Sequence, residues 1–142
     1  MFVAIGGVNL SSQPSEPTVF VVDDEAVIAQ TVVIILRNAG YEARSFSEPE
    51  AALDAVTVES PDLLVTDIAM PEMNGIELAT RIQELRPCCK VLVLSGQLST
   101  SVLVAKAENA GHHFDFLSKP VHPLKLLEKI EDVLSEYLGG VA

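Results

Sequence analysis

The sequence is short of positive charge. Lys and Arg together number 9 against 20 Asp and Glu, which gives a formal net charge of −11. A chain with this balance repels the phosphates of a nucleic acid, so no direct binding to nucleic acid is expected. Most of the acidic residues are expected to form a solvated surface that aids solubility. One short run, Asp23-Asp24-Glu25, needs its own explanation.

Cysteine is also scarce. The two cysteines, Cys88 and Cys89, are neighbours in the sequence. Adjacent cysteines rarely form a disulfide because the geometry is strained, and no second Cys or Cys–His pair stands at a spacing that binds zinc. The sequence therefore predicts two free thiols, as expected in a reducing compartment such as the cytoplasm.

Long hydrophobic runs are missing as well. No stretch reaches the roughly 20 consecutive apolar residues that a membrane-spanning helix needs, so no membrane insertion is expected. Residues 1–10 are apolar but contain no basic residue, and their hydrophobic run is short for a signal peptide. Together these absences predict a cytoplasmic protein.

The chain length is typical of one domain. Residues 11–17, SSQPSEP, are polar and rich in proline, which is typical of a linker. We therefore expect a flexible leader over residues 1–16 and one domain over residues 17–138. Residues 139–142 are expected to form a frayed tail.

Within that domain, short apolar runs alternate with helical patterns. The strands are expected at residues 18–22, 41–46, 62–66, 90–94 and 114–117. The helices are expected at residues 25–39, 48–58, 76–85, 99–109 and 124–138. Five strand–helix units with nearly continuous apolar strands predict an α/β fold, in which helices cover both faces of a doubly wound parallel sheet. The pattern leaves the strand order open.

Periodicity also predicts which helix faces point inward. For residues 25–39 the inward stripe is Ile28, Val32, Ile35 and Leu36. For residues 124–138 it is Leu124, Leu127, Ile130, Leu134 and Leu138. At the start of the helix over residues 48–58, Ser47 followed by Glu50 predicts a capping box.

Polar residues follow four of the five expected strands. Asp23 and Asp24 follow the first strand, Asp67 the third, Ser95 the fourth and Lys119 the fifth. In doubly wound sheets, sites form beyond the carboxyl ends of the strands. The three carboxylates converge if the first and third strands are neighbours.

Three carboxylates in one place repel one another, each pair by a few kcal/mol at an effective dielectric of about 20. Such a cluster predicts a bound cation, and oxygen ligands without His or Cys favour a hard one. Mg²⁺ binds one or two carboxylates together with phosphate oxygens. The alternative is that acids at positions 23–25 favour the positive end of a helix dipole. That alternative leaves Asp67, Ser95 and Lys119 unexplained.

The same groups suit phosphoryl transfer. A carboxylate can act as a nucleophile and form an acyl phosphate. The transition state spreads negative charge over the phosphoryl oxygens, so positioning and neutralisation dominate catalysis. Lys119 would supply a positive charge, and Ser95 a hydroxyl donor.

Four motifs at the strand ends carry a family resemblance. They are VVDDE (Val21–Glu25), TDIAMPEMNG (Thr66–Gly75), LVLSG (residues 92–96) and FLSKP (Phe116–Pro120). In this order they resemble the receiver domain of response regulators in two-component signalling, over residues 17–138. The resemblance implies a flavodoxin-like sheet with strand order 2-1-3-4-5 and five helices.

The resemblance also implies roles in a Mg²⁺ site. Asp67 matches the phosphoacceptor. Asp24, Asp67 and the backbone carbonyl of Ala69 match the groups that touch the ion, and Asp23 matches the acid that reaches it through water. The implied donor is a histidine kinase or a histidine phosphotransfer protein. The chain is expected to be a signalling acceptor and not an enzyme.

Further implied roles concern switching. Ser95 matches the switch hydroxyl, Phe116 the switch aromatic and Lys119 the phosphate-binding lysine, and the Lys119–Pro120 peptide bond is expected to be cis. Phosphorylation would reshape the face formed by the fourth helix, the fifth strand and the fifth helix, which a downstream protein reads. Phe116 lacks the hydroxyl of a tyrosine, so it cannot make the polar contact that a tyrosine makes when turned outward.

Three other functions are considered. A pseudo-receiver that binds proteins without phosphorylation would be expected to have a damaged acid cluster, and this one is intact. A phosphoaspartate hydrolase would have a second Asp where this chain has Ala69. A flavin-binding module would replace the acids after the first strand with a phosphate-binding loop. Separately, the apolar residues Val27, Val33 and Ile34 predict a surface where the donor's helices dock. The alternative is that the N-terminal leader folds over this helix.

Overall fold

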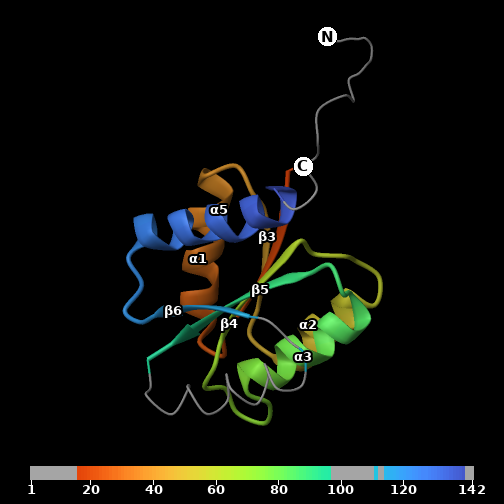
Figure 1. The fold of residues 1–142 in the computed structure, drawn as a ribbon. Coiled ribbons are helices and arrows are strands. Elements are labelled where there is room, and N and C mark those ends of the chain that lie inside the picture. Colours follow the sequence, from red (N-terminus) through yellow and green to blue (C-terminus); the bar gives the residue numbers. More distant parts are fainter. Residues whose placement is uncertain (1–15, 97–110, 112–113, 140–142) are drawn as a thin grey trace, which may run out of the picture.

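The computed structural model describes residues 16–96, 111 and 114–139, and the chain forms a three-layer α/β structure (Figure 1). The strands are β2 (Thr18–Val22), β3 (Glu42–Phe46), β4 (Leu63–Asp67), β5 (Lys90–Ser95) and β6 (Asp115–Ser118). The helices are α1 (Ala26–Asn38), α2 (Pro49–Val56), α3 (Gly75–Leu85) and α5 (Pro123–Gly139). The helix expected at residues 99–109 lies outside the described residues.

Within the described residues, five strands form one sheet in the order β3-β2-β4-β5-β6, and every neighbouring pair is parallel. In chain order this is 2-1-3-4-5, so the expected fold class and strand order are both confirmed.

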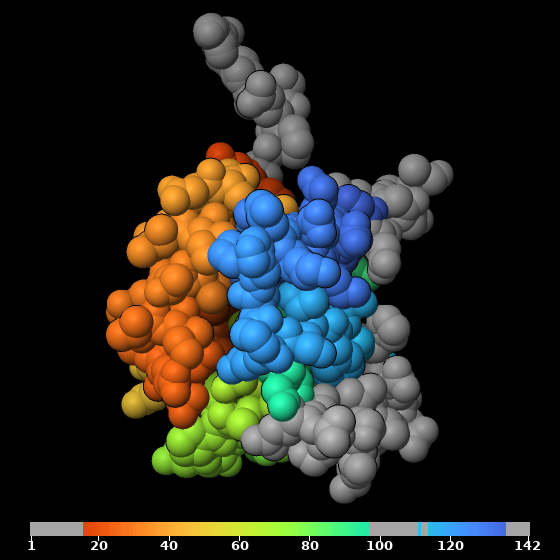
Figure 2. Space-filling view, turned by 90° about the vertical axis from the view of Figure 1, so that its left-hand side faces the viewer, coloured from red at the N-terminus to blue at the C-terminus, as the bar shows by residue number. Residues whose placement is uncertain are grey.

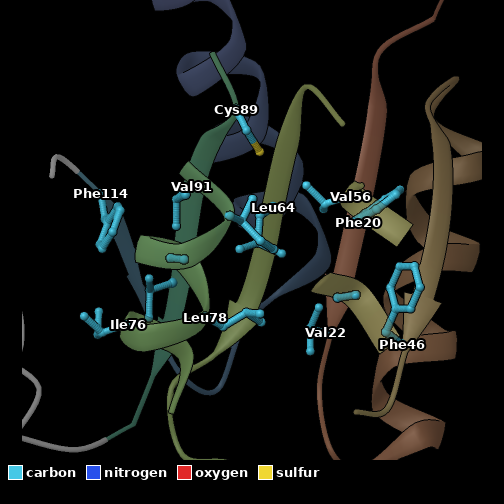
Figure 3. Packing of buried hydrophobic residues seen from close by; sticks show 14 of the residues in the cluster. Phe20, Val22, Phe46, Val56, Leu64, Ile76, Leu78, Cys89, Val91 and Phe114 are labelled. Carbon is cyan, nitrogen blue, oxygen red and sulfur yellow. The ribbon is translucent and has the colours of Figure 1, made fainter. Parts of the chain in front are cut away.

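The sheet separates two hydrophobic cores. In β2, Phe20 and Val22 belong to one core and Val19 and Val21 to the other, because successive side chains of a strand point to opposite faces. Figure 1 shows α2 and α3 on one side of the sheet and α1 and α5 on the other. Figure 3 shows the first core, which gathers side chains from several strands, among them Phe20 of β2, Phe46 of β3, Leu64 of β4 and Val91 of β5. Both faces are covered, which explains why the strands read as continuous apolar runs.

The parallel register brings the carboxyl ends of the strands to one edge. Val22 pairs with Thr66, and Asp67 pairs with Leu94 one step further on. At the opposite edge Asp62 joins three strands. Its carboxylate accepts a hydrogen bond from the Thr18 N–H at 2.8 Å, its own N–H donates to the Thr18 carbonyl, and its carbonyl accepts from the Lys90 N–H.

The buried face of α1 matches the expected one only in part: Leu36 is buried as expected, and Val32 is partly buried against the second core. The buried residues are Ala29, Val33 and Leu36, and Ile28 is 39% exposed. This helix carries apolar residues on most of its surface, so its periodicity does not single out the face that meets the sheet. Burial of Val33 also removes it from the predicted docking surface, whereas Val27 and Ile34 are exposed.

The face of α5 is likewise rotated. Leu126, Ile130, Val133 and Leu134 are buried, whereas Leu124 is 66% exposed. The expected stripe was therefore right at Ile130 and Leu134, partly right at Leu127, which is half-buried against the second core, and wrong at Leu124. The side chain of Leu138 lies outside the described residues. Nowhere in the described ranges is a helix both long and apolar enough to cross a bilayer.

The capping box expected at α2 is absent. The residue that caps α2 is Glu48, and no side chain makes a cap hydrogen bond there. Pro49 occupies the first turn, where its ring fixes φ and it has no N–H that needs a partner. Ser47 therefore lies one residue too early to cap this helix.

The two cysteines are free, as expected. Cys88 is exposed and Cys89 is buried. Burial raises the pKa of the Cys89 thiol to about 12, so this side chain packs in the core as a neutral thiol.

Candidate functional site

Three carboxylates meet at the carboxyl edge of the sheet. Asp23 and Asp24 follow β2, and Asp67 ends β4 beside them. One oxygen from each lies within 4.8 Å of the others. Asp23 is 3% and Asp67 8% exposed, whereas Asp24 is open to solvent. The expected convergence of these three side chains is therefore found.

Asp23 sits in an unfavourable place for a charge. Its Oδ1 accepts a hydrogen bond of 2.9 Å from the backbone N–H of Glu25, which favours the ionised form. Burial acts in the other direction and is the larger effect, and the negative charges of Asp67 and Asp24 add to it. The pKa of Asp23 is therefore raised above its usual range.

Lys119 supplies the positive charge of the site. Its Nζ lies 2.8 Å from Asp67 Oδ1 and 3.9 Å from Asp23 Oδ2. Its backbone N–H donates to the carbonyl of Ser95 at 2.9 Å, which ties the residue to the end of β5. The Lys119–Pro120 peptide bond is cis, as expected. Burial lowers the pKa of Lys119. The hydrogen bond to Asp67 and the nearby carboxylates raise this pKa by more than burial lowers it, so the net shift is upward.

The loop after Asp67 is held at both ends. The Ile68 N–H donates to the Leu94 carbonyl at 3.2 Å, and the Gly75 N–H donates to the Ile68 carbonyl at 2.9 Å. A Cβ at position 75 would lie 2.1 Å from the carbonyl oxygen of Asp67. Gly75 is therefore required because the start of α3 touches the backbone of the acid. Ala69, a proposed source of a metal-binding carbonyl, is exposed in this loop.

Ser95 and Phe116 lie on the side of the site formed by β5 and β6. Ser95 ends β5, is 9% exposed and pairs with Ser118, which directly precedes Lys119. Phe116 pairs with Val93 and is half-buried against the first core. A half-buried aromatic side chain therefore lies next to the strand that carries Ser95.

Sequence reasoning did not single out Thr66. This residue is fully buried in β4, and its hydroxyl donates to the Asp67 carbonyl at 2.9 Å. The same carbonyl faces Gly75. A polar residue in an otherwise apolar strand was the available signal, because a buried hydroxyl needs a partner.

The donor set fits a hard cation. The cluster offers carboxylate oxygens from Asp23, Asp24 and Asp67, with no His or Cys among them. One lysine offsets only part of the repulsion among three carboxylates. Mg²⁺ suits such oxygen ligands and keeps sites open for phosphate oxygens.

Comparison with known proteins identifies the family. The protein-family model described as the response regulator receiver domain matches residues 19–131. The response regulator receiver protein CpdR of Brucella abortus is 34% identical over 116 residues, which cover 82% of this chain and 95% of that protein. The chemotaxis protein CheY of Thermotoga maritima is also 34% identical over 116 residues, with 81% and 95% covered.

Other relatives are much longer. The DNA-binding transcriptional regulator NtrC of Rhizobium meliloti is 35% identical over 119 residues, but the match spans only 24% of that protein. Among solved structures, a CheY-like receiver domain protein from Methanospirillum hungatei superposes with a TM-score of 0.79 at 33% identity, covering 89% of this chain and 99% of that one. The sheet order, the acidic cluster at the strand ends and these matches agree: the chain belongs to the response regulator receiver domain family, the signalling modules of two-component systems.

Proposed function

We propose that this receiver accepts a phosphoryl group on Asp67, with Mg²⁺ as cofactor and a histidine kinase or histidine phosphotransfer protein as donor. The observation that carries the proposal is the 2.8 Å contact between Asp67 Oδ1 and Lys119 Nζ inside the acidic cluster. An ammonium group there can stay with the phosphoryl oxygens after transfer.

The three carboxylates differ in their fitness for this role. Asp23 has one oxygen bound to the Glu25 N–H, so that oxygen is not free to attack phosphorus. Asp24 is exposed to solvent, which weakens any electrostatic control of its chemistry. Asp67 is buried, lies at the end of the central strand β4 and is paired with a cation.

The proposed reaction is a transfer between two nucleophiles. A carboxylate oxygen of Asp67 attacks phosphorus, so an O–P bond forms as the P–N bond of the donor's phosphohistidine breaks. The electron pair of that bond returns to the imidazole, which takes up a proton from solvent and leaves neutral. The Lys119 ammonium would pair with the Asp67 carboxylate before transfer and with the phosphoryl oxygens after it.

Asp24, Asp67 and the carbonyl of Ala69 would hold Mg²⁺ directly, and Asp23 would reach it through water. When bound, the ion neutralises negative charge on the phosphoryl oxygens and helps to orient them. The functional unit is proposed to span residues 17–138, with residues 1–16 and 139–142 outside it.

A switch through Ser95 and Phe116 is proposed to report the transfer. The Ser95 hydroxyl would move toward a phosphoryl oxygen, and Phe116, now half-buried, would turn fully inward. The surface that changes is proposed to include β6 and α5 together with the helix expected at residues 99–109, which lies outside the described residues, and a downstream protein would read it. Phosphorylation shifts the population of the two arrangements and does not create a new fold.

Mass spectrometry tests the acceptor residue. The protein is incubated with acetyl phosphate and Mg²⁺, and its intact mass is measured for wild type, Asp67→Asn and the matched control Asp54→Asn. Asp54 is an exposed aspartate of α2. A single phosphoryl adduct is expected in wild type and control, lost with EDTA and lost in Asp67→Asn.

The other outcomes are equally informative. An adduct that persists in Asp67→Asn would mean that another residue accepts the group. No adduct on folded protein that binds Mg²⁺ would favour a pseudo-receiver, which recognises proteins without being phosphorylated.

A further inference from the structure

An apolar groove runs between α1 and the segment that enters α5. It has a volume of about 350 Å³ and is lined mainly by apolar side chains, among them Ile28, Val32 and Ile35 on one side and Val121 and Leu126 on the other. Figure 2 shows α1 and the chain around residue 120 side by side on this face. Ile28 is 39% exposed, so the groove presents a large apolar side chain to water.

A second hollow of about 240 Å³ borders the same helices. It lies where α1 ends and is lined by Ala39 and Tyr41 together with Leu124, Leu127, Glu128 and Glu131 of α5. Leu124 is 66% exposed. Both hollows therefore border the first turns of α5. Exposed apolar surface of this kind is typical of a binding face.

The chain enters the described structure beside the second hollow. The Glu42 N–H donates to the Pro17 carbonyl at 3.0 Å, and the neighbouring residue Tyr41 lines that hollow. Six extended residues reach about 20 Å, and α1 rises only about 16 Å between Ile28 and Ala39. A segment preceding residue 11 can therefore reach the groove.

The chemistry of that segment matches the groove. Residues 2–10 read FVAIGGVNL and carry no charged side chain, while all 20 acidic residues of the chain lie at position 16 or beyond. An uncharged apolar segment can approach this acidic domain without repulsion. A short tether also keeps it at an effective concentration in the millimolar range.

We propose that residues 2–10 bind in the groove between α1 and α5 as an intramolecular ligand. They cover apolar residues next to the acid cluster, since Lys119 also lines the groove. The groove lies on the α1 side of the site, where the donor is expected to approach. Any hindrance of the donor's approach would rest on the proposed function, whereas binding of the segment does not.

Fluorescence tests the binding directly. The sequence contains no tryptophan, so Phe2→Trp provides a single reporter in the 142-residue chain. Thr31 is exposed and lines the groove, so Thr31→Arg blocks it, while Gln30→Arg adds the same charge at an exposed α1 residue outside the lining. Blue-shifted emission and weak acrylamide quenching are expected with Phe2→Trp alone and with Gln30→Arg.

Adding Thr31→Arg should release the reporter, with a red shift and several-fold stronger quenching. A second variant, Val3→Asp with Ile5→Asp, should release it as well and leaves the folded domain untouched. The proposal would be overturned if the Phe2→Trp chain showed the same emission and quenching as a free peptide of residues 1–15 with the same substitution. So would a reporter that stays protected in both blocking variants. No phosphoryl donor is present, so failure here is distinct from failure of the acceptor role of Asp67.

Discussion

At the scale of single residues, the site destabilises the ionised form of Asp23. Its carboxylate is buried beside Asp67 and Asp24, and these effects raise its pKa. A carboxyl group whose pKa is higher in the folded state binds its proton more tightly there. Ionisation of Asp23 therefore reduces stability as the pH rises from its usual value of 3.8 through the raised one.

Asp23→Asn should therefore stabilise the protein at neutral pH without Mg²⁺, by about 1–3 kcal/mol, the size of a weakened like-charge repulsion. The amide oxygen can still accept the Glu25 N–H. Urea unfolding in EDTA at several pH values measures the effect, and the gain should vanish below the usual pKa. Addition of Mg²⁺ should reduce the difference in unfolding free energy between the variant and the wild type, because the wild type binds the ion better. Equal stability of the two proteins at pH 7 would contradict this account.

The site residues were predictable because each follows a separate strand. Asp23, Asp67 and Lys119 could be assigned from the sequence, since parallel strands end at one edge. Their individual electrostatics could not. The difference between Asp23 and Asp67 depends on the Glu25 N–H and the position of the Lys119 ammonium, which only three-dimensional contacts reveal.

At the scale of elements, the start of α3 is locked against the acid loop. A Cβ on Gly75 would collide with the Asp67 carbonyl at 2.1 Å. Gly75→Ala should therefore cost about 1–3 kcal/mol of stability, as is usual for overpacking, and should slow phosphorylation by moving Asp67. Gly96→Ala is the matched control, because its Cβ would meet Lys119 Cβ at an ordinary 3.7 Å. Thermal unfolding and the intact-mass assay together measure both effects, and similar behaviour of the two variants would refute the locking.

Helix existence could be read from the sequence more reliably than helix orientation. The pattern located α1 and α5 but pointed Ile28 and Leu124 inward, where the structure leaves both exposed. A helix that is apolar on most sides gives a weak directional signal. The start of α2 was misjudged for a different reason. Glu48 is the N-cap residue and Pro49, which has no N–H, occupies the first turn, so Ser47 lies one residue too early to cap the helix.

At the scale of the whole molecule, α1 presents an apolar surface beside the site. Val27 is 74% exposed at the start of α1, whereas Val33, which the sequence also suggested, is buried and would report on folding. Val27→Glu should slow transfer from a cognate phosphohistidine protein about tenfold, equivalent to about 1.4 kcal/mol of docking energy. Transfer from acetyl phosphate should change little.

Val58→Glu is the matched control for this substitution. Val58 is 80% exposed and follows α2, away from the site. It should leave both rates unchanged. If Val27→Glu slowed both donors equally, it would be acting on the acid cluster and not on docking.

The contact between Lys119 and the carboxylates also sets the charge balance of the molecule at this edge. Three carboxylates and one ammonium leave two surplus negative charges when all are ionised, the amount that a single divalent ion cancels. Phosphorylation would exchange one carboxylate charge for about two on the phosphate. With a divalent ion bound, the phosphorylated site would then differ from the neutral unphosphorylated one by about one unit of charge. Every rearrangement of Ser95, Phe116 and their surroundings would have to be driven by that single unit and by the hydrogen bonds that the new oxygens accept.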